Sequence, residues 1–372
     1  MKYYIIAGEA SGDLHASNLM RALKTEDPQA EFRCWGGDLM QEAGGTVVKH
    51  YRDLAFMGFL EVALNIRTIL RNFRFCEKDM ISWKPDVVIL VDYPGFNLRM
   101  ARFACAHGFR VFYYISPQLW AWRSSRVKKI KRYVERMFVI LPFEQEFYRK
   151  YGYEVDFVGH PLPDAIDHET TNASGTGEDL TALSGGRPVI ALLPGSREQE
   201  ISAILQIMLK VIPEFPEYSF IIGAAPAIPA SFYRSLTAGY DVKLVEGRTH
   251  DLLRIAVAAL VTSGTATLET ALFRVPQVVC YKGSALSFWI ARQVVNVRFI
   301  SLVNLIMDRE TVKELIQHEL TPRRLTTELQ HILEEDQRSR ILADYARLAE
   351  ILGGKGASAR AARLMVQYLQ AN

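Results

Sequence analysis

Asp92 stands directly after an almost wholly apolar run, in the segment VVILVDYPGFN, where Pro94 and Gly95 then force the chain to turn. In an open parallel sheet the carboxyl ends of the strands face the ligand crevice, so a carboxylate at this position can serve as a general base. Aspartate also caps helices and turns, and Asn97 has the same ambiguity. The residues alone therefore leave Asp92 as either a catalytic base or a cap.

Acidic residues surround two glycines near the N-terminus, in the segment GEASGD. Gly8 and Gly12 allow a ligand to approach the backbone closely. Glu9 and Asp13 make this loop a poor cradle for phosphate, because their charges repel an anion, and a better one for sugar hydroxyls. The alternative is a helix start that Ser11 or Asp13 caps.

A second strand-like run that leads into a helix, VIALLPGSREQE, lies just past the midpoint. Pro194 and Gly195 end the run. Ser196 is placed to cap the helix, which puts Arg197 in its first turn. A cation there opposes the helix dipole unless it serves an anion. The segment therefore favours a phosphate site over a surface ion pair.

Hydroxyl residues open another helix in VTSGTATLETAL. Ser263, Gly264, Thr265 and Thr267 supply hydroxyls and amides at the helix start. Such a loop suits a diphosphate, with Glu269 on the first turns reaching a ribose. An ordinary capped helix is the other open interpretation.

Several nucleotide-binding motifs are missing from the chain. It contains no GxxxxGK[ST], which disfavours a P-loop ATPase, and no GxGxxG dinucleotide fingerprint. It also contains no Asp-x-Asp pair, so we expect no carboxylate-held metal ion, and we expect no cofactor. Arg197 and helix termini would then have to stabilise a leaving phosphate.

Two stretches are typical of a membrane-facing surface, and the first is Ala55 to Phe75. Its apolar residues, Phe56, Met57 and Phe59 among them, cover more than half of a helical circumference, and arginines gather toward one end. This combination suits an interfacial helix that dips into acyl chains. A buried core helix is the alternative.

The second stretch is LWAWRSSRVKKIKRYVERM, in which Trp120 and Trp122 precede a basic run that includes Arg123 and Arg126. Tryptophans beside a basic run fit a lipid headgroup interface. Nucleic acid is the competing ligand, and a solvated basic face is the third interpretation.

These residues need a scaffold, and the chain is long enough to build two domains. At 372 residues it exceeds what one core usually supports, and 49% hydrophobic with 23% charged residues describes a globular protein. The net charge of +3 is too small to indicate nucleic acid by itself. Two lobes that face each other would form a cleft, which is where small molecules usually bind.

Short strand-like runs alternate with helical patterns, which predicts an α/β protein with doubly wound parallel sheets. A polar stretch at 167–187 separates an N-terminal domain, 1–166, from a second alternating region that starts at 188. From about residue 286 the pattern is helical to the end. The expected strands are Tyr3 to Ala7, Glu31 to Trp35, Val87 to Val91, Arg110 to Ile115, Met137 to Leu141, Glu154 to Val158, Val189 to Leu193, Ser219 to Ile222, Val242 to Val245, Ala258 to Val261 and Gln277 to Cys280.

Cysteine usage indicates a reducing compartment. Cys34, Cys76, Cys105 and Cys280 show no CxxC spacing and no histidine at zinc-finger distance, so we expect thiols without disulfides or structural metal. The N-terminus lacks the pattern of a signal peptide, and no window reaches the roughly 18 apolar residues of a spanning helix. We expect a soluble cytoplasmic protein, with contact to a membrane left open.

Seven motifs follow one another across nearly the whole chain: AGEASGD, SWKPDVVILVDYPGFN, YYISPQLWAWRSSRVKKI, FVGHPLPD, LLPGSR, SGTATLE and SLVNLI. Each is weak alone, but the ordered set closely resembles the lipid A disaccharide synthases. The resemblance implies the two-lobed glycosyltransferase B fold. It also implies an inverting transfer that joins UDP-2,3-diacylglucosamine to 2,3-diacylglucosamine 1-phosphate, forming a β-1,6-linked disaccharide and releasing UDP.

The resemblance assigns roles to individual residues of this sequence. It implies Asp92 as the base for the acceptor hydroxyl and Glu9 as a further active-site carboxylate. It places Arg197, Glu269 and Asn304 at the UDP portion of the donor. The assignment of Asn304 rests on the resemblance alone.

One position departs from the family pattern: many relatives have Asp where this chain has Gly95, so a second carboxylate is missing there. The fold implies a UDP-sugar domain over 188–342 and C-terminal helices, 343–372, that cross back to the first domain. Acylated substrates imply that the two apolar and basic stretches dock on the cytoplasmic surface of the inner membrane. A homodimer is implied by the resemblance alone.

Three rival functions stay open at this point. A UDP-sugar epimerase or another glycosyltransferase B-fold enzyme would share the nucleotide lobe, and an epimerase would need no membrane-facing surface. A non-catalytic two-lobed binding protein would normally carry an export signal when it acts outside the cytoplasm. Nucleic-acid binding through the basic run is the weakest alternative, because no recognised module surrounds it.

Overall fold

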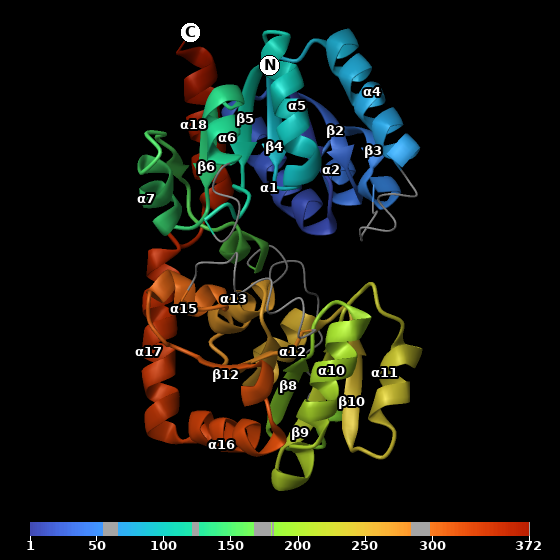
Figure 1. Ribbon diagram of the computed structural model, residues 1–372, viewed down its shortest axis with the longest axis vertical. Coiled ribbons are helices and arrows are strands. Elements are labelled where there is room, and N and C mark those ends of the chain that lie inside the picture. The colour runs from blue at the N-terminus through green and yellow to red at the C-terminus, as the bar shows by residue number, and fades with distance from the viewer. Residues whose placement is uncertain (55–65, 121–125, 167–179, 181, 284–297, 372) are drawn as a thin grey trace. The chain divides into compact units, whose positions relative to one another are not determined.

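The computed structural model describes residues 1–54, 66–120, 126–166, 180, 182–283 and 298–371 (Figure 1). Contacts within the chain divide it into two compact units. The first consists of Met1–His168 together with Leu352–Asn372, and the second of Glu169–Ile351.

The first unit is built on a seven-stranded sheet with the strand order β3-β2-β1-β4-β5-β6-β7. Every neighbouring pair of strands is parallel. The strands are β1 (Lys2–Ala7), β2 (Glu31–Gly36), β3 (Thr46–His50), β4 (Val87–Val91), β5 (Arg110–Tyr114), β6 (Arg136–Val139) and β7 (Asp156–Phe157).

Both faces of this sheet are covered by helices, as its apolar strands require. Successive residues of a strand point to opposite faces, so Tyr4 and Ile6 enter one core while Tyr3 and Ile5 enter the other. The first core also takes side chains from α4, α5, α6 and α7, and the second from α1, α2 and α18. These helices are α1 (Ala10–Glu26), α2 (Asp38–Glu42), α4 (Ile66–Trp83), α5 (Pro94–Ala106), α6 (Val127–Tyr133), α7 (Phe143–Arg149) and α18 (Ala357–Gln370), with a 3₁₀ turn, η1, at Tyr51–Leu54.

The last helix, α18, belongs to the first unit although it closes the chain (Figure 1). Ala361 and Met365 of α18 share a core with Leu19 of α1. The Asp164 carboxylate accepts hydrogen bonds from the backbone N–H groups of Gly356, at 2.6 Å, and Ser358, at 3.1 Å. It thereby satisfies amides at the start of α18, which have no partner within the helix.

The second unit is built on a six-stranded parallel sheet with the order β10-β9-β8-β11-β12-β13. Leu252 and Leu253 of α12 pack on β8 and β9 through Leu193 and Ile221. The strands are β8 (Val189–Leu193), β9 (Ser219–Ala224), β10 (Val242–Glu246), β11 (Ala256–Thr262), β12 (Gln277–Tyr281) and β13 (Lys313–Ile316). The helices are α10 (Glu198–Leu209), α11 (Ala230–Thr237), α12 (Thr249–Ile255), α13 (Thr265–Leu272), α15 (Leu302–Met307), α16 (Pro322–Leu333) and α17 (Glu335–Ile351), with 3₁₀ turns η3 (Ile212–Glu214) and η4 (Gln317–Glu319).

The predicted doubly wound parallel sheets are confirmed in both units. The sequence interpretation missed β3 and β13, which lie at the edges of their sheets. β3 is half-buried or exposed at every position, so its residues carry little of the apolar signal that marks a strand. β13 has four residues and interrupts a region whose pattern is otherwise helical.

Within the described parts of the chain, no helix combines the length and the apolar character that crossing a membrane requires.

Candidate active site

The first site lies where two neighbouring strands of the first sheet end. The chain leaves β1 for β2 on one side and later returns to β4 on the other, so the strand order reverses between β1 and β4. Ala7 of β1 lies opposite Val91 of β4 in the register, which brings the segments that follow them together. Ligands of open parallel sheets bind at such a reversal, beyond the carboxyl ends of the strands. Glu9 and Asp92 follow these two strand ends.

The backbone at Asp92 is strained and firmly held. Asp92 and Tyr93 have φ angles of 41° and 47°, in the left-handed region that few residues other than glycine adopt. The Asp92 carbonyl accepts hydrogen bonds from Asn97 Nδ2, at 2.8 Å, and from the Tyr113 hydroxyl, at 2.6 Å. Strain of this kind costs about 1–3 kcal/mol per residue and clusters at functional sites. The Asn97 side chain thus holds the turn between β4 and α5, and this turn carries the Asp92 carboxyl.

The Asp92 carboxyl is electrostatically perturbed. Its pKa is raised from the ordinary value of 3.8 to about 6, chiefly by burial and next by the negative charge of Glu9, while a hydrogen bond from the Tyr93 backbone N–H partly opposes both. A carboxylate whose pKa approaches the working pH is a stronger base than an exposed one and is still ionised near pH 7. The arrangement is chemically suited to accept a proton.

The glycine before Glu9 serves internal packing. A Cβ atom on Gly8 would lie 2.3 Å from Cδ1 of Tyr93, so the Tyr93 ring needs the space that glycine leaves. Glu9 is the N-cap residue of α1, but its side chain makes no capping hydrogen bond and is exposed. Its carboxylate therefore remains available beside Asp92.

Asp13 is used inside the unit. Its buried carboxylate accepts hydrogen bonds from the backbone N–H groups of Gly37, at 2.7 Å, Leu39, at 3.2 Å, and Met40, at 3.1 Å. These bonds hold the start of α2. Asp13 does not cap α1, so that alternative is wrong. Its expected contact with a sugar ligand stays a prediction that this buried geometry does not support.

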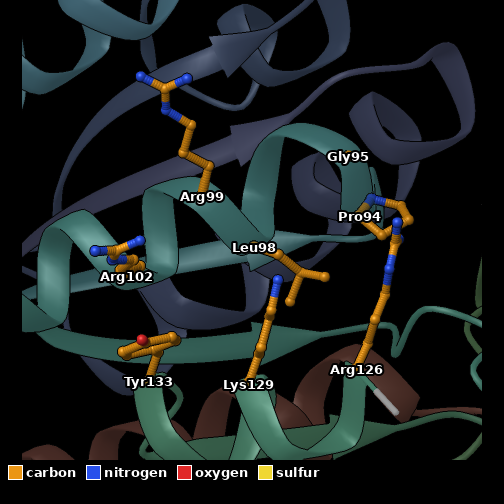
Figure 2. Close-up of a pocket in the computed structure, with 8 residues that line it drawn as sticks. All are labelled: Pro94, Gly95, Leu98, Arg99, Arg102, Arg126, Lys129 and Tyr133. Carbon is orange, nitrogen blue, oxygen red and sulfur yellow. The ribbon is translucent and has the colours of Figure 1, made fainter. Parts of the chain in front are cut away.

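A basic pocket of about 270 Å³ lies between α5 and α6 (Figure 2). It begins two residues after Asp92, at the start of α5. Arg126 and Lys129 extend from α6 toward Pro94 and Leu98 of α5. The pocket is lined by Pro94, Gly95, Leu98, Arg99, Arg102, Arg126, Lys129 and Tyr133.

The predicted docking residues are only partly within the described chain. Phe56, Met57, Phe59, Trp122 and Arg123 lie outside the described residues.

Trp120 is half-buried, and its ring meets Phe143 edge-on with the centroids 5.0 Å apart. On α4, Phe73, Cys76 and Met80 are buried in the first unit's core. The opposite face exposes apolar side chains: Leu70 is 40%, Phe75 43% and Ile81 45% exposed.

The second site is a pocket of about 320 Å³ at the strand ends of the second sheet. The strand order reverses between β8 and β11, as it does between β1 and β4. The pocket receives residues from the ends of β8, β9 and β11 and from α10, α12 and α13. Its lining is Leu193, Gly195, Ser196, Glu200, Gly223, Ala224, Ala225, Pro226, Thr249, Thr262, Ser263, Gly264, Thr265, Ala266 and Glu269.

Arg197 lies beside this pocket as the N-cap residue of α10, one position before the predicted first turn. Its side chain is 74% exposed and lies 3.6 Å from the Glu200 carboxylate, from guanidinium Nη1 to Oε1. Ser196 and Glu200 line the pocket on either side of it in sequence. The helix start carries no side-chain cap, so the expected capping by Ser196 is wrong.

Of the predicted diphosphate loop, Ser263, Gly264, Thr265 and Glu269 line the pocket. Thr267 does not, because it is buried and its hydroxyl donates to the Gly264 carbonyl at 2.8 Å. The Ser263 hydroxyl donates to the Ile300 carbonyl at 2.9 Å. The Glu269 carboxylate lies 3.7 Å from His250 Nε2. His250 also lines a smaller pocket of about 190 Å³ beside Arg248, Thr249 and Asp251.

The sequence interpretation missed Thr249, His250 and the segment from Gly223 to Pro226. Thr249 and His250 follow β10, while Gly223 to Pro226 form the end of β9 and the turn after it. The rule that ligands bind at the carboxyl ends of strands was therefore the signal that could have found them. A Cβ on Gly223 would lie 2.8 Å from Leu193 Cδ2, which explains why a residue without a side chain stands there.

Asn304 is fully engaged within the second unit. Its Nδ2 donates to the Val312 carbonyl, at 2.8 Å, and to Glu314 Oε1, at 2.9 Å. Its Oδ1 accepts from the backbone N–H groups of Thr311, at 2.7 Å, and Val312, at 2.9 Å. A carboxamide has two donors and two acceptor positions, so no polar atom of Asn304 is left over for a ligand. Its predicted contact with the donor stays a prediction that this geometry does not support.

By sequence, the family model and the curated relatives all match this chain to the same family. The model of the family described as lipid-A-disaccharide synthetase matches residues 3–367. The chain is 42% identical over 379 residues to the lipid-A-disaccharide synthase of Syntrophus aciditrophicus, which covers 98% of this chain and 97% of that protein. It is 39% identical over 372 residues to the enzyme of the same name from Myxococcus xanthus, with 98% and 97% covered.

Solved structures of low sequence identity share the fold. The co-structure of S. aureus MnaA with UDP matches with a TM-score of 0.73 at 13% identity, covering 100% of this chain and 97% of that chain. UDP-GlcNAc 2-epimerase from Neisseria meningitidis matches with a TM-score of 0.69 at 13% identity, with 100% of both chains covered. The calicheamicin glycosyltransferase CalG4 matches with a TM-score of 0.63 at 15% identity, with 100% and 98% covered.

Proposed function

The chain belongs to the lipid-A-disaccharide synthetase family, and from this premise we propose that it uses Asp92 as a general base to join two acylated glucosamines. It is a glycosyltransferase of lipid A disaccharide synthesis, and its substrates are a UDP-sugar and a sugar phosphate. The donor that we propose is UDP-2,3-diacylglucosamine, and the acceptor is 2,3-diacylglucosamine 1-phosphate.

The observation that carries the assignment of the base is the environment of Asp92. The residue follows a buried central strand, and its backbone carbonyl is held by Asn97 and Tyr113. Burial, together with the negative charge of Glu9, raises the pKa of its carboxyl to about 6. A cap would use its carboxylate to accept hydrogen bonds from a helix start, as Asp13 does. Asp92 is instead held through its backbone, which supports the role of base over that of cap.

The proposed reaction is a single displacement. The Asp92 carboxylate takes the proton from the acceptor's 6-hydroxyl as that oxygen attacks the anomeric carbon of the donor. The new C–O bond forms while the bond from the same carbon to the UDP oxygen breaks, and the electron pair leaves with UDP. A single displacement inverts the configuration at the anomeric carbon, so no covalent enzyme intermediate is needed.

The leaving UDP is assigned to the pocket of the second unit. The starts of α10 and α13 contribute Ser196, Gly264 and Thr265 to its lining, and helix N-termini favour anions. Arg197 is mostly exposed, so its guanidinium is available to a diphosphate at the cost of one weak ion pair. Glu269 supplies an acceptor for ribose hydroxyls. We assign Asn304 to holding this unit together rather than to contact with UDP.

We also propose that the enzyme docks on the inner membrane through the exposed face of α4. Leu70, Phe75 and Ile81 are exposed there, and Arg71 and Arg74 are exposed on the same helix. Apolar and basic side chains on one helix suit a surface of anionic lipid. Binding to anionic vesicles should fall in Leu70→Ser/Phe75→Ser and persist in Leu183→Ser, which removes an equally exposed apolar side chain from the second unit. Equal binding by both variants would contradict the docking surface.

We also propose a homodimer, which rests on the family resemblance alone and which sedimentation velocity tests.

The test of the reaction is an assay with paired substrates. Purified protein should release UDP when both acylated substrates are present and not when either is omitted. A UDP-sugar epimerase would instead convert the donor without any acceptor. Conversion of the UDP-sugar alone, with no disaccharide formed, would refute the proposed transfer.

A further inference from the structure

We propose that the basic pocket between α5 and α6 binds the 1-phosphate of the acceptor sugar, an inference that rests on the function proposed above. The ligand class is a phosphomonoester on a hexose. The residues that we assign to it are Arg102, Arg126 and Lys129.

The first argument is charge. Among the described residues that line the pocket, none is acidic. In the part of the chain that the structure describes, Arg102 and Lys129 form no ion pair, and both are exposed. Arg126 adds a third positive charge from the start of α6. Clustered cations repel one another, and a phosphomonoester, with a charge of about −1.5 to −2 at pH 7, would offset that repulsion.

Arg99 lines the same pocket but serves another partner. Its guanidinium carbon lies 4.0 Å from the centre of the Phe73 ring, a cation–π contact with α4. In Figure 2 its head group points away from Lys129 and Arg126, which extend from α6 toward α5. We therefore exclude Arg99 from the phosphate site and predict that its loss affects packing against Phe73.

The size of the pocket argues for part of a ligand rather than a whole one. Pockets that enclose a complete small molecule usually measure about 300–1,000 Å³. At about 270 Å³ this one is below that range and suits a phosphate with the edge of a sugar ring. Arginine favours such a ligand because its planar fork can donate two parallel hydrogen bonds to phosphate oxygens.

The position of the pocket argues for the acceptor as the source of the phosphate. Pro94, which lines the pocket, is two residues from Asp92, so their Cα atoms lie within about 7 Å of each other. An acceptor whose 6-hydroxyl meets the Asp92 carboxylate carries its phosphate at the far side of the same ring. One hexose can thus reach from Asp92 to the end of the pocket at Pro94, near which Arg126 lies in Figure 2. A phospholipid headgroup has the same phosphate chemistry, but nothing in it would require a place beside the base.

The experiment compares two acceptors with the double variant Arg102→Gln/Lys129→Gln. The acceptors are 2,3-diacylglucosamine 1-phosphate and the same lipid without its phosphate, both in micelles of a neutral detergent that contain no phospholipid. In the wild type we expect a lower KM for the phosphorylated acceptor than for the acceptor without phosphate. In the variant its KM should rise at least about tenfold, the loss expected for charge-assisted hydrogen bonds. The KM for the other acceptor and for the donor should not change.

Lys128→Gln is the matched control, because Lys128 lies on α6, is exposed and does not line the pocket. It should keep the wild-type preference. A second arm needs no turnover: binding of glucosamine 1-phosphate and of glucosamine is measured by NMR titration of the wild type and the double variant. The wild type should bind the phosphate more tightly, and the variant should bind both alike.

The outcomes separate the pocket from the reaction. An active double variant that keeps the preference for the phosphorylated acceptor overturns the pocket and leaves the proposed function intact. A defect that appears on anionic vesicles alone, with micelle kinetics unchanged, also overturns it and assigns the pocket to a lipid headgroup. Selective, pocket-dependent binding of glucosamine 1-phosphate without any UDP release would support the phosphate site while refuting the proposed function.

Discussion

Replacing Asp92 with Asn should make the protein more stable at neutral pH while it removes most of the activity. Asparagine has nearly the same shape and tolerates positive φ, so the turn at Asp92 and Tyr93 is kept. It cannot accept the proton of a hydroxyl, so turnover should fall at least about a hundredfold, as expected on loss of a general base.

The stabilisation follows from the raised pKa of Asp92. The folded state holds this carboxyl at a pKa of about 6 and the unfolded chain at about 3.8, so between these values the folded state binds more protons. The free energy of unfolding therefore falls as the pH rises through this range, and the destabilisation by the ionised Asp92 carboxylate is complete above pH 6. A difference of about 2.2 pKa units at 1.36 kcal/mol each makes this destabilisation at most about 3 kcal/mol. At pH 4 it shrinks to about 0.5 kcal/mol.

Denaturant unfolding at pH 8 and at pH 4, together with the UDP-release assay, measures both effects on one variant. Asp92→Asn should gain about 1–3 kcal/mol at pH 8 and little at pH 4. Glu217→Gln, which neutralises an exposed carboxylate in the second unit, should gain nothing at either pH. An Asp92→Asn protein that is no more stable than wild type at pH 8 would refute the raised pKa. Full activity in that variant would refute its role as the base.

Three further predictions concern the neighbouring residues. Glu9→Gln removes the negative charge that helps to raise the pKa of Asp92, so the acidic side of the profile of kcat/KM against pH should move to lower pH. An unchanged profile would show that the charge of Glu9 does not raise the pKa of Asp92. Arg197→Ala should raise the KM for the UDP-sugar at least about tenfold with little change in Tm, because the side chain is exposed and makes one weak ion pair; thermal melts and donor titrations decide this, and a lowered Tm with normal KM would assign the residue to structure. Asn304→Leu should lower the free energy of unfolding by about 2–4 kcal/mol, because it leaves the backbone N–H groups of Thr311 and Val312 without an acceptor and removes one of the hydrogen bonds to the Glu314 carboxylate. Normal stability combined with a raised donor KM would favour direct contact with UDP.

Local patterns were sufficient to predict much of this protein. β4 is apolar at all of its positions because both faces of its sheet are covered, and that burial is legible as an uninterrupted apolar run. The alternation of such runs with helical patterns predicted the parallel sheets. The place of Asp92 after β4, and of Ser263 to Glu269 after β11, predicted the strand ends at which the two sites lie. These predictions hold because the period of side-chain burial and the turn after a strand are local properties.

The tertiary structure alone decided what the polar side chains do. Asp13 meets the amides of Gly37 to Met40, and Asn304 meets Glu314, across stretches of sequence whose spacing carries no signal. Arg102 and Lys129 line one pocket because α5 and α6 are brought together by packing on the same sheet. The raised pKa of Asp92 likewise depends on burial and on Glu9, which is far away in sequence. A hydrogen bond or a charge interaction acts over a few ångströms in space, so only the folded chain determines which groups take part in it.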